Sequence, residues 1–326
     1  ALFIVAIGEN PIDAYAALFR GAFDGELRLG TTLAGFTPLL LTSIAFAVAA
    51  KAGAFNVGVE GEVFLGGITA AYIGLNWTFL PKPALYVACF VGAMVVAAAW
   101  AFIPAVLRAY YNVNEVCTTI LMNTVALYIT SYLVSGPMSA GTANAQSLPV
   151  TVRLYQFMKP SSVNVGIFIA AITVIVIIFM LQKSSWGYKI RTVGLNPTHA
   201  DYVGIDSKKV FVGAMMLSGM LGGMAGCIEV LGVHGYFLNN FATGLGSNGM
   251  LAALIVKNNM VSTPFMAFFL AVLKSGAMGM QQSTGVPKSL VDTITAVFII
   301  IATMETAFQF TKKRKKKTEE KKEDKA

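Results

Sequence analysis

Charged side chains are scarce in this sequence. Of its 326 residues only 12% are Asp, Glu, Lys or Arg, about half the share that is usual in soluble globular domains. Hydrophobic residues make up 56%, and the mean hydropathy is +0.68. This composition excludes a soluble enzyme and a disordered chain, and it is typical of a protein that crosses a membrane several times.

Residue types that commonly carry chemistry are also few. The three cysteines, Cys89, Cys117 and Cys227, lie in apolar runs without the spacing of a metal or redox pair, which excludes a disulfide scaffold. The two histidines, His199 and His234, have no neighbouring residues that would complete a metal site. We therefore expect no catalytic residue, no metal and no cofactor.

Nucleotide-binding motifs are missing as well. No lysine directly follows a glycine, so the chain has no G-x-x-x-x-G-K-[ST] phosphate loop for ATP hydrolysis. Residues 244–249 match G-x-G-x-x-G formally, but no strand precedes them and no βαβ unit surrounds them. We expect instead a glycine-rich break that leads into a half-helix beginning near Ser247. The chain is therefore not expected to be an enzyme.

Long apolar runs are what the sequence has in abundance. Short, Gly-interrupted runs in membranes are typical of broken or re-entrant helices that line a cavity. We expect an all-α, polytopic membrane protein with about ten transmembrane helices, some of them broken or short. Residues 1–7 read as the end of a first span whose start is missing. The other expected spans are 34–50, 61–76, 84–107, 115–135, 164–182, 210–232, 247–256, 264–282 and 289–310.

Basic residues are divided unevenly between the two expected sides. If the spans alternate and the C-terminus is cytoplasmic, 17 Lys and Arg lie inside and six outside, in keeping with the positive-inside rule. Nine of the 17 belong to a low-complexity tail, residues 311–326, which we expect to be disordered and to contact anionic lipid. Residues 1–310 are then one transmembrane domain, with residues 183–209 as its large cytoplasmic loop.

Several polar residues lie at or near membrane depth, where polar groups usually face a cavity or mark a pathway. Residues 53–61, Gly-Ala-Phe-Asn-Val-Gly-Val-Glu-Gly, join two apolar runs and contain Asn56 and Glu60. A simple solvated turn is the alternative for this segment. Asn248 follows the glycine-rich break, where it could face a pore.

A polar stripe lies within the expected span 115–135. Asn114 or Asn112 could cap the helix that follows, and Thr119 and Asn123 are four residues apart, so they share one helical face. Hydrogen bonding between helices is the alternative explanation for this stripe. We expect Asn56, Glu60, Thr119, Asn123 and Asn248 to line a substrate path.

Residues 187–209 carry the signals of a short cytoplasmic helix. Asn196 is a good N-cap, Pro197 suits the first helical position, and Gly204 suits the stop. The pattern predicts a helix over about 197–203, which could dock a soluble partner. An ordinary positive-inside loop explains the charges of this segment but not the capped helix.

Several motifs together resemble one family of transport proteins. They are residues 53–61, residues 114–123 (Asn-Glu-Val-Cys-Thr-Thr-Ile-Leu-Met-Asn), residues 190–205 (Ile-Arg-Thr-Val-Gly-Leu-Asn-Pro-Thr-His-Ala-Asp-Tyr-Val-Gly-Ile), residues 9–23 and residues 255–259. The chain is similar to permease subunits of bacterial ABC importers, in the simple-sugar and nucleoside branch that is related to the ribose and branched-chain amino-acid permeases. The resemblance runs from about residue 8 to residue 310.

The resemblance implies the partners and the location. It implies a cytoplasmic ABC ATPase, a second, paralogous permease subunit and an extracellular substrate-binding lipoprotein, in a bacterial plasma membrane and without nucleic acid. It also implies that the 187–209 loop carries the coupling helix that docks on the ATPase. The residues assigned to this coupling are Gly194, Asn196, Pro197, Ala200, Tyr202, Gly204 and Ile205.

The function expected from this resemblance is nucleoside import. The chain would form half of the translocation path, while a separate subunit hydrolyses ATP. A simple-sugar importer permease of the same architecture is the main alternative. An ion-coupled secondary transporter or channel, and a membrane scaffold that recruits acidic partners through the basic tail, are alternatives from other classes.

Overall fold

The computed structural model describes residues 10–284, 289 and 293 of the chain. Within this part the regular secondary structure is helical, and pairing between extended segments is confined to isolated bridges. The all-helical prediction is confirmed. The elements in chain order are α2 (Pro11–Phe23), α3 (Gly25–Lys51), α4 (Val59–Asn76), α5 (Lys82–Tyr111), α6 (Glu115–Ser135), α7 (Gly166–Lys183), α8 (Ser185–Leu195), α9 (Pro197–Tyr202), α10 (Ser207–Ile228), the π-helix η1 (Glu229–His234), α11 (Leu245–Ile255) and α12 (Thr263–Thr284).

Six helices of the described residues are long and apolar enough to cross a membrane, namely α3, α5, α6, α7, α10 with η1, and α12. Each coincides with an expected span, although α3 already begins at Gly25. The expected spans 61–76 and 247–256 correspond to α4 and α11, which are not among the six. The count of about ten is therefore not confirmed. The expected first span, residues 1–7, and the expected tail, residues 311–326, lie outside the described residues. So does the expected span 289–310, except for residues 289 and 293.

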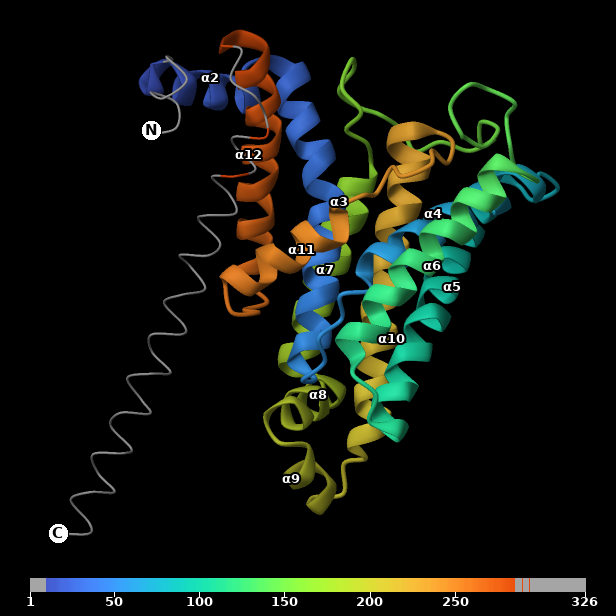
Figure 1. The fold of residues 1–326 in the computed structure, drawn as a ribbon, viewed down its shortest axis with the longest axis vertical. Helices are drawn as coiled ribbons and strands as arrows, with labels where there is room; N and C mark the ends of the chain where they lie inside the picture. Colours follow the sequence, from blue (N-terminus) through green and yellow to red (C-terminus); the bar gives the residue numbers. More distant parts are fainter. Residues whose placement is uncertain (1–9, 285–288, 290–292, 294–326) are drawn as a thin grey trace.

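The segment before the first described span contains a separate helix, α2. The Asn10 side chain accepts a hydrogen bond from the Ile12 amide at 3.0 Å, and Pro11 follows it at the first helical position, so the start of α2 is capped. The chain then breaks at Gly25, whose φ of +77° is a left-handed value that glycine adopts without strain. As a result α2 lies across the end of α3 and α12 rather than alongside them (Figure 1).

The centre of the bundle is α10, which packs on α3, α4 and α5. Small residues allow the backbones to come close there. A Cβ added at Gly226 would collide with the Val63 carbonyl oxygen, and one added at Gly223 with the Ala93 carbonyl oxygen. The Gly-rich sequence of α10 therefore serves close packing between helices, as small residues do in membrane bundles.

The connection between α3 and α4 folds back into the bundle. After α3 ends at Lys51, the chain turns, and α4 begins near mid-height of the molecule (Figure 1). Ala54, Asn56 and Gly58 of this connection are buried. Residues 53–61 are thus not a simple solvated turn, and the alternative stated for them above is wrong.

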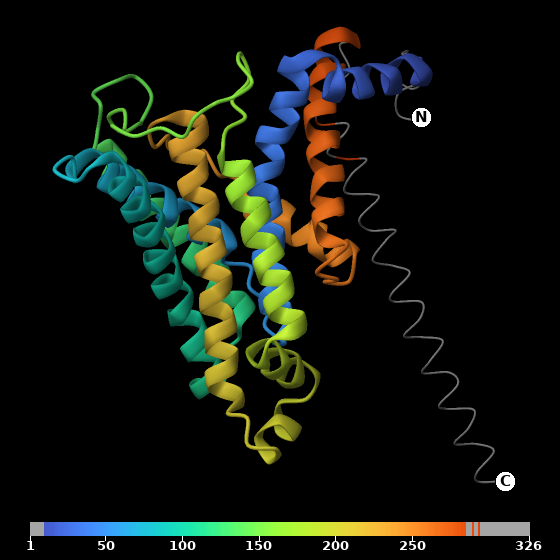
Figure 2. The ribbon, with the colours of Figure 1, turned by 180° about the vertical axis from the view of Figure 1, so that it is seen from behind.

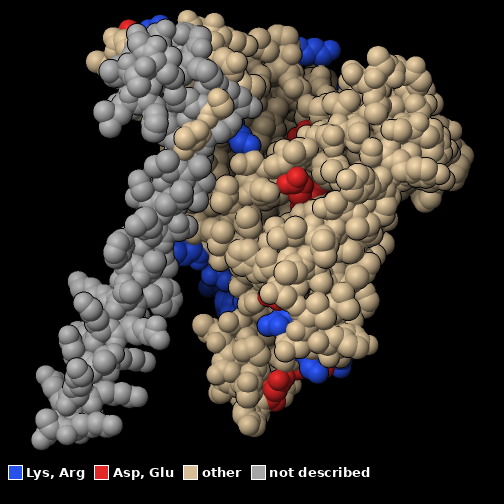
Figure 3. All heavy atoms as spheres, in the orientation of Figure 1, with Lys and Arg blue, Asp and Glu red and all other residues tan. Residues whose placement is uncertain are grey.

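Figure 2 shows the same bundle from behind, with α8 and α9 at one end and the long segment 136–165 at the other. The helices α3, α5 and α7 all end beside α8, and each has a basic residue in its last turn: Lys51, Arg108 and Lys183. Between the two ends, the face seen in Figure 3 carries only isolated charged groups. On this face, charge is therefore sparse between the two ends.

Candidate functional site

The first turn of α4 is held by a side chain from another helix. Gly58, the N-cap residue of α4, has no side chain that could cap it. Asn123 of α6 takes over: its Oδ1 accepts a hydrogen bond from the Gly61 amide at 2.8 Å, and its Nδ2 donates to the Val57 carbonyl at 2.9 Å. One amide group thus fixes both sides of the start of α4, which satisfies backbone groups that a helix end leaves open.

Asn56 joins three parts of the bundle. The side chain is almost completely buried, and its Nδ2 donates to Glu62 Oε1 at 2.8 Å and to Ser218 Oγ at 2.9 Å. Its Oδ1 accepts from the Gly58 amide at 2.9 Å. Because Glu62 lies on α4 and Ser218 on α10, this amide ties the α3–α4 connection to both helices.

Thr119 is buried in the contact between α6 and the α3–α4 connection. Its hydroxyl donates to the carbonyl oxygens of Glu115 and Val116 in its own helix. A Cβ added at Gly58 would lie 3.2 Å from the Thr119 Cβ, so the two residues pack closely. Of the polar stripe, then, Asn123 bonds across to another element, as the alternative above described, whereas Thr119 bonds to its own helix.

Glu60 lies where α4 meets the start of α11. The Ser247 hydroxyl donates to Glu60 Oε2 at 3.3 Å, and a Cβ added at Gly246 would lie 2.5 Å from the Glu60 nitrogen. Glu60 and Asn248 are half-buried and Ser247 is exposed. Asn248 Nδ2 donates to the Gly244 carbonyl, and the left-handed φ of +80° at Gly244 starts the helix. The glycine-rich break and half-helix are as predicted.

The structure thus brings the five expected path residues to one region around the start of α4. Asn56 and Thr119 are buried, whereas Glu60, Asn123 and Asn248 are half-buried. Each of the five has a hydrogen bond to a protein group. That they line a substrate path stays a prediction. Ser247 was missed as a contact residue, although the sequence marked it as the start of the half-helix.

A second candidate site is the helix pair α8–α9. The Asn196 side chain accepts from the His199 amide at 3.0 Å, Pro197 begins α9, and Gly204 has a φ of +81°. The predicted short helix is confirmed and ends at Tyr202. Ala200 is fully buried, and its carbonyl accepts from the Ile205 amide at 2.9 Å.

The preceding helix, α8, was read as loop. Its N-cap is Ser184, whose hydroxyl accepts from the Gly187 amide at 3.0 Å. Gly194 in the last turn of α8 touches the end of α3, and a Cβ added there would collide with the Lys51 carbonyl oxygen. A displacement of α8 would therefore press on the chain five residues before Asn56.

The tip of this helix pair exposes apolar side chains. Leu195 is 88% exposed and Tyr202 is 86% exposed, and Tyr188 and Val203 are exposed as well. These four residues, here called the tip surface, belong to α8, to α9 and to the position after α9, and both helices lie at the end of the molecule away from α2 (Figure 1). Large exposed apolar residues outside the spans are typical of a surface that a protein partner covers.

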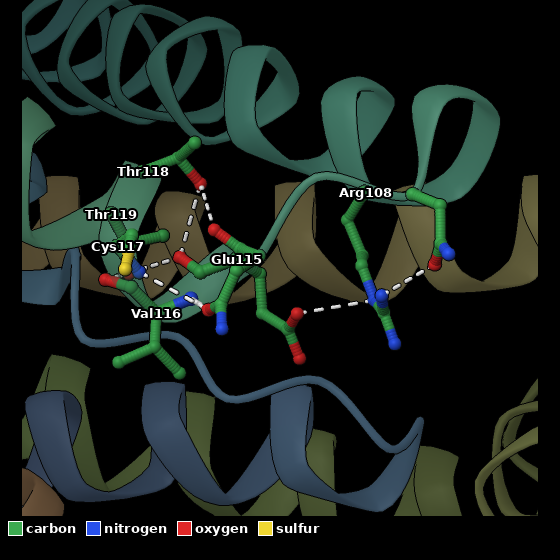
Figure 4. A network of polar contacts seen from close by, with 8 residues as sticks. Arg108, Glu115, Val116, Cys117, Thr118 and Thr119 are labelled. Carbon is green, nitrogen blue, oxygen red and sulfur yellow. Dashed lines mark hydrogen bonds and ion pairs between the residues drawn. The ribbon is translucent and has the colours of Figure 1, made fainter.

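The turn between α5 and α6 is held by a network of polar contacts (Figure 4). Arg108 Nε is 3.1 Å from Glu115 Oε2, and Arg108 Nη1 donates to Asn112 Oδ1 at 2.7 Å. Asn114 caps α6 by accepting from the Val116 amide at 2.9 Å, as predicted. A cavity of about 350 Å³ separates this turn from Gly194 and Pro197 of the helix pair.

Comparison with known proteins places the chain in a family. The family described as "Branched-chain amino acid transport system / permease component" matches residues 28–303. The guanosine ABC transporter permease protein NupP of Bacillus subtilis is 32% identical over 97% of this chain and 92% of its own length.

Two further relatives are of the same type. The nucleoside ABC transporter permease protein NupB of Lactococcus lactis is 31% identical over 92% of this chain and 85% of its own length. The glucose ABC transporter permease protein of Haloferax volcanii is 32% identical over 91% of this chain and 81% of its own length. No solved structure matches the chain significantly. The chain belongs to the family of permease components of branched-chain amino acid transport systems.

Proposed function

We propose that this chain is the transmembrane permease subunit of an ATP-binding-cassette importer and forms half of the translocation path for a nucleoside. Two of the similar proteins carry guanosine or nucleoside transport in their names, which supports the substrate class. A separate cytoplasmic ATPase hydrolyses ATP, and an extracellular lipoprotein delivers the substrate to this subunit and a second, paralogous permease in the plasma membrane.

The observation that carries this proposal is the link from the tip surface to the start of α4. The tip surface receives the ATPase, and Gly194 passes its displacement to Lys51 at the end of α3. The α3–α4 connection follows directly, and Asn56 and Asn123 attach it to α4, α6 and α10. Movement of the ATPase would thus shift the start of α4 and alternate the access of the path. We assign the seven coupling residues named in the sequence analysis to this link between the ATPase and α4.

The path itself runs past the half-exposed side of the α4–α11 contact. Glu60, Ser247 and Asn248 present a carboxylate, a hydroxyl and an amide there, which suit the hydroxyl and N–H groups of an uncharged nucleoside. Asn56, Thr119 and Asn123 form the wall behind these groups and keep them in place. Path lining in the narrow sense is therefore assigned to Glu60 and Asn248, and a supporting role to the other three.

Substitution of the wall and of the path separates these roles. We expect Asn248→Leu to abolish guanosine uptake in cells while the subunits still co-purify, because it replaces a half-buried polar group of the proposed path and leaves the tip surface unchanged. Asn56→Leu and Asn123→Leu should also abolish uptake. Asn144→Leu, at an exposed position of the 136–165 segment, is the matched control and should transport normally. Normal uptake by all three path and wall variants would contradict the assignment.

Docking of the ATPase is tested on the tip surface. In mild detergent, the wild-type subunit should pull down an ATPase and a second permease. Tyr202→Ala together with Leu195→Ala should lose the ATPase and keep the second permease. Tyr155→Ala, an exposed aromatic residue at the opposite end, should keep both. Retention of the ATPase by the double variant would refute the docking role.

The second candidate function is import of a simple sugar, because one similar protein carries glucose transport in its name. Competition decides between the two: excess guanosine should block uptake of a labelled nucleoside, whereas excess glucose should not. An ion-coupled transporter is distinguished by ATP depletion, which would leave its uptake intact and would stop that of the proposed importer.

A further inference from the structure

A series of aromatic rings extends from α4 toward η1. Phe64 lies one turn after Glu60 on α4, and its ring centroid is 5.7 Å from that of Phe241 in an edge-to-face contact. The Phe241 ring is 5.8 Å from His234, and the His234 ring is 6.2 Å from Tyr236. These rings therefore form a continuous series of contacts, in which Phe64 is buried and His234, Tyr236 and Phe241 are half-buried. The half-buried rings are here called the aromatic surface.

The backbone fixes where these rings lie. Phe237 is fully buried, its amide donates to Ser147 Oγ at 2.9 Å, and its carbonyl accepts from the Ser147 amide at 2.9 Å. Phe241 packs edge-to-face on Phe237 and sits over Gly67, where an added Cβ would lie 2.9 Å from its Cζ. The aromatic surface is thus preorganised, which lowers the entropic cost of binding on it.

Ionisable groups show which side of the helices the rings face. Glu229 and His234 lie at the two ends of η1, with 3.7 Å between Glu229 Oε2 and His234 Nε2, and the side chains are 10% and 26% exposed. Such groups within a span almost always face the bundle interior or a water-filled pathway, because exposure to lipid is costly. The half-exposed rings of Tyr236 and Phe241 lie beside them.

The segment that carries the rings leads straight to the path. It begins at Gly235 and ends at Gly244, both with left-handed φ values, and continues into α11. Three residues later Ser247 contacts Glu60. A substrate that comes from the end occupied by the 136–165 segment would therefore meet the rings before it meets Glu60.

We propose that His234, Tyr236 and Phe241 form an aromatic collar on which the nucleobase stacks before it reaches Glu60. Every base has a planar π-face, so stacking accepts different bases, while Glu229 and His234 offer hydrogen-bonding groups to the base edge. The collar rests on the proposed function, since it names the part of a nucleoside that these residues recognise. A ribose without a base has no such planar face.

The test uses the complete transporter in proteoliposomes and follows the rate of guanosine uptake at a guanosine concentration well below saturation, where the rate reports binding. Phe241→Leu should lower this rate by about tenfold, because base–aromatic stacking is lost. Phe241→Tyr keeps the ring and should stay within about twofold of the wild type. The matched control is Phe157→Leu, at an aromatic pair with Phe168 outside the collar, which should transport normally.

Equal rates for Phe241→Leu and the wild type would overturn the collar, and so would an equal loss in Phe241→Leu and Phe241→Tyr, which would indicate packing rather than stacking. If Phe241→Leu does not assemble, the uptake rates of Tyr236→Leu and Tyr236→Phe are compared instead. A loss in Tyr236→Leu alone would support the collar, and equal rates in the two variants would overturn it. The wild-type transporter serves as the reference: absence of guanosine uptake by it would refute the proposed function instead.

Discussion

At the scale of single residues, three asparagines show that the same side-chain amide can have different structural roles. Asn196 caps the helix that it precedes, and Asn114 does the same for α6. Asn123 caps a helix to which it does not belong, since its partners Val57 and Gly61 are about sixty residues away in the chain. Its amide completes a helix start that glycine leaves uncapped.

Replacement of Asn123 by alanine should therefore destabilise the start of α4. The loss of both hydrogen bonds should cost about 1–2 kcal/mol, in the range of a lost N-cap with unpaired backbone groups. Thermal unfolding of the purified subunit in detergent measures this loss. Asn144→Ala, whose side chain is exposed, should unfold like the wild type. An unchanged midpoint for Asn123→Ala would show that the start of α4 is stable without this cap.

At the scale of elements, the contact between α4 and α10 depends on the absence of side chains. Gly226 leaves no room for a Cβ beside the Val63 carbonyl, whereas a Cβ added at Gly35 in α3 meets nothing within 4 Å. The two glycines are alike in sequence terms, since both lie in apolar helices. The two glycines differ only in the groups that pack against them.

This difference predicts opposite effects of the same substitution. Gly226→Ala should destabilise the protein by about 1–3 kcal/mol, because the helices must move apart. Gly35→Ala should be neutral or stabilising by up to about 1 kcal/mol, since alanine favours the helix. Thermal unfolding of the two variants side by side measures this. Equal unfolding midpoints of the two variants would mean that α4 and α10 can move apart without loss of stability.

The short helix α9 is the element most dependent on its caps. With the six residues Pro197–Tyr202 it is too short to persist without tertiary support. Asn196→Ala should remove about 1 kcal/mol of capping and fray the helix, and Asn196→Asp should retain the cap. Hydrogen exchange of the peptide spanning 195–205 should be faster in the alanine variant only. Similar exchange in both variants would argue against a role of the cap.

At the scale of the whole molecule, the helices place α8 and α9 at the end opposite to α2 and the 136–165 segment (Figure 1). The basic last turns of α3, α5 and α7 gather at the α8–α9 end. By the positive-inside rule this end should be cytoplasmic. The same orientation is required for the tip surface to meet a cytoplasmic ATPase.

Cysteine labelling checks this orientation. Cys117 is exposed whereas Cys89 and Cys227 are buried, so Cys117→Ala provides a background of low reactivity. In that background Tyr202→Cys should react with a membrane-impermeant maleimide in inside-out vesicles and not in intact cells. Tyr155→Cys should show the reverse. Labelling of Tyr202→Cys in intact cells would invert the topology and with it the proposed direction of coupling.

The sequence by itself determined the features that depend on neighbours within a few residues. The apolar runs predicted most helices, Asn114 and Asn196 predicted helix starts, and the glycine-rich segment from Gly244 predicted the break before α11. Caps and helical faces act over only three or four residues. The helix α8 was missed because its Ser184 cap is followed by a weakly apolar stretch in a loop-like context.

Only the tertiary structure decided what each polar group faces. The partners of Asn56 and Asn123, the contact of Glu60 with Ser247 and the contact of Phe64 with Phe241 all join residues that are far apart in the chain. Hydropathy and spacing give the cost of placing such groups in a membrane, but the packing of α4, α6, α10 and α11 determines whether a protein group or an open surface meets them. For this reason the sequence located the polar region at the start of α4, whereas the hydrogen-bond partner of each polar group there required the fold.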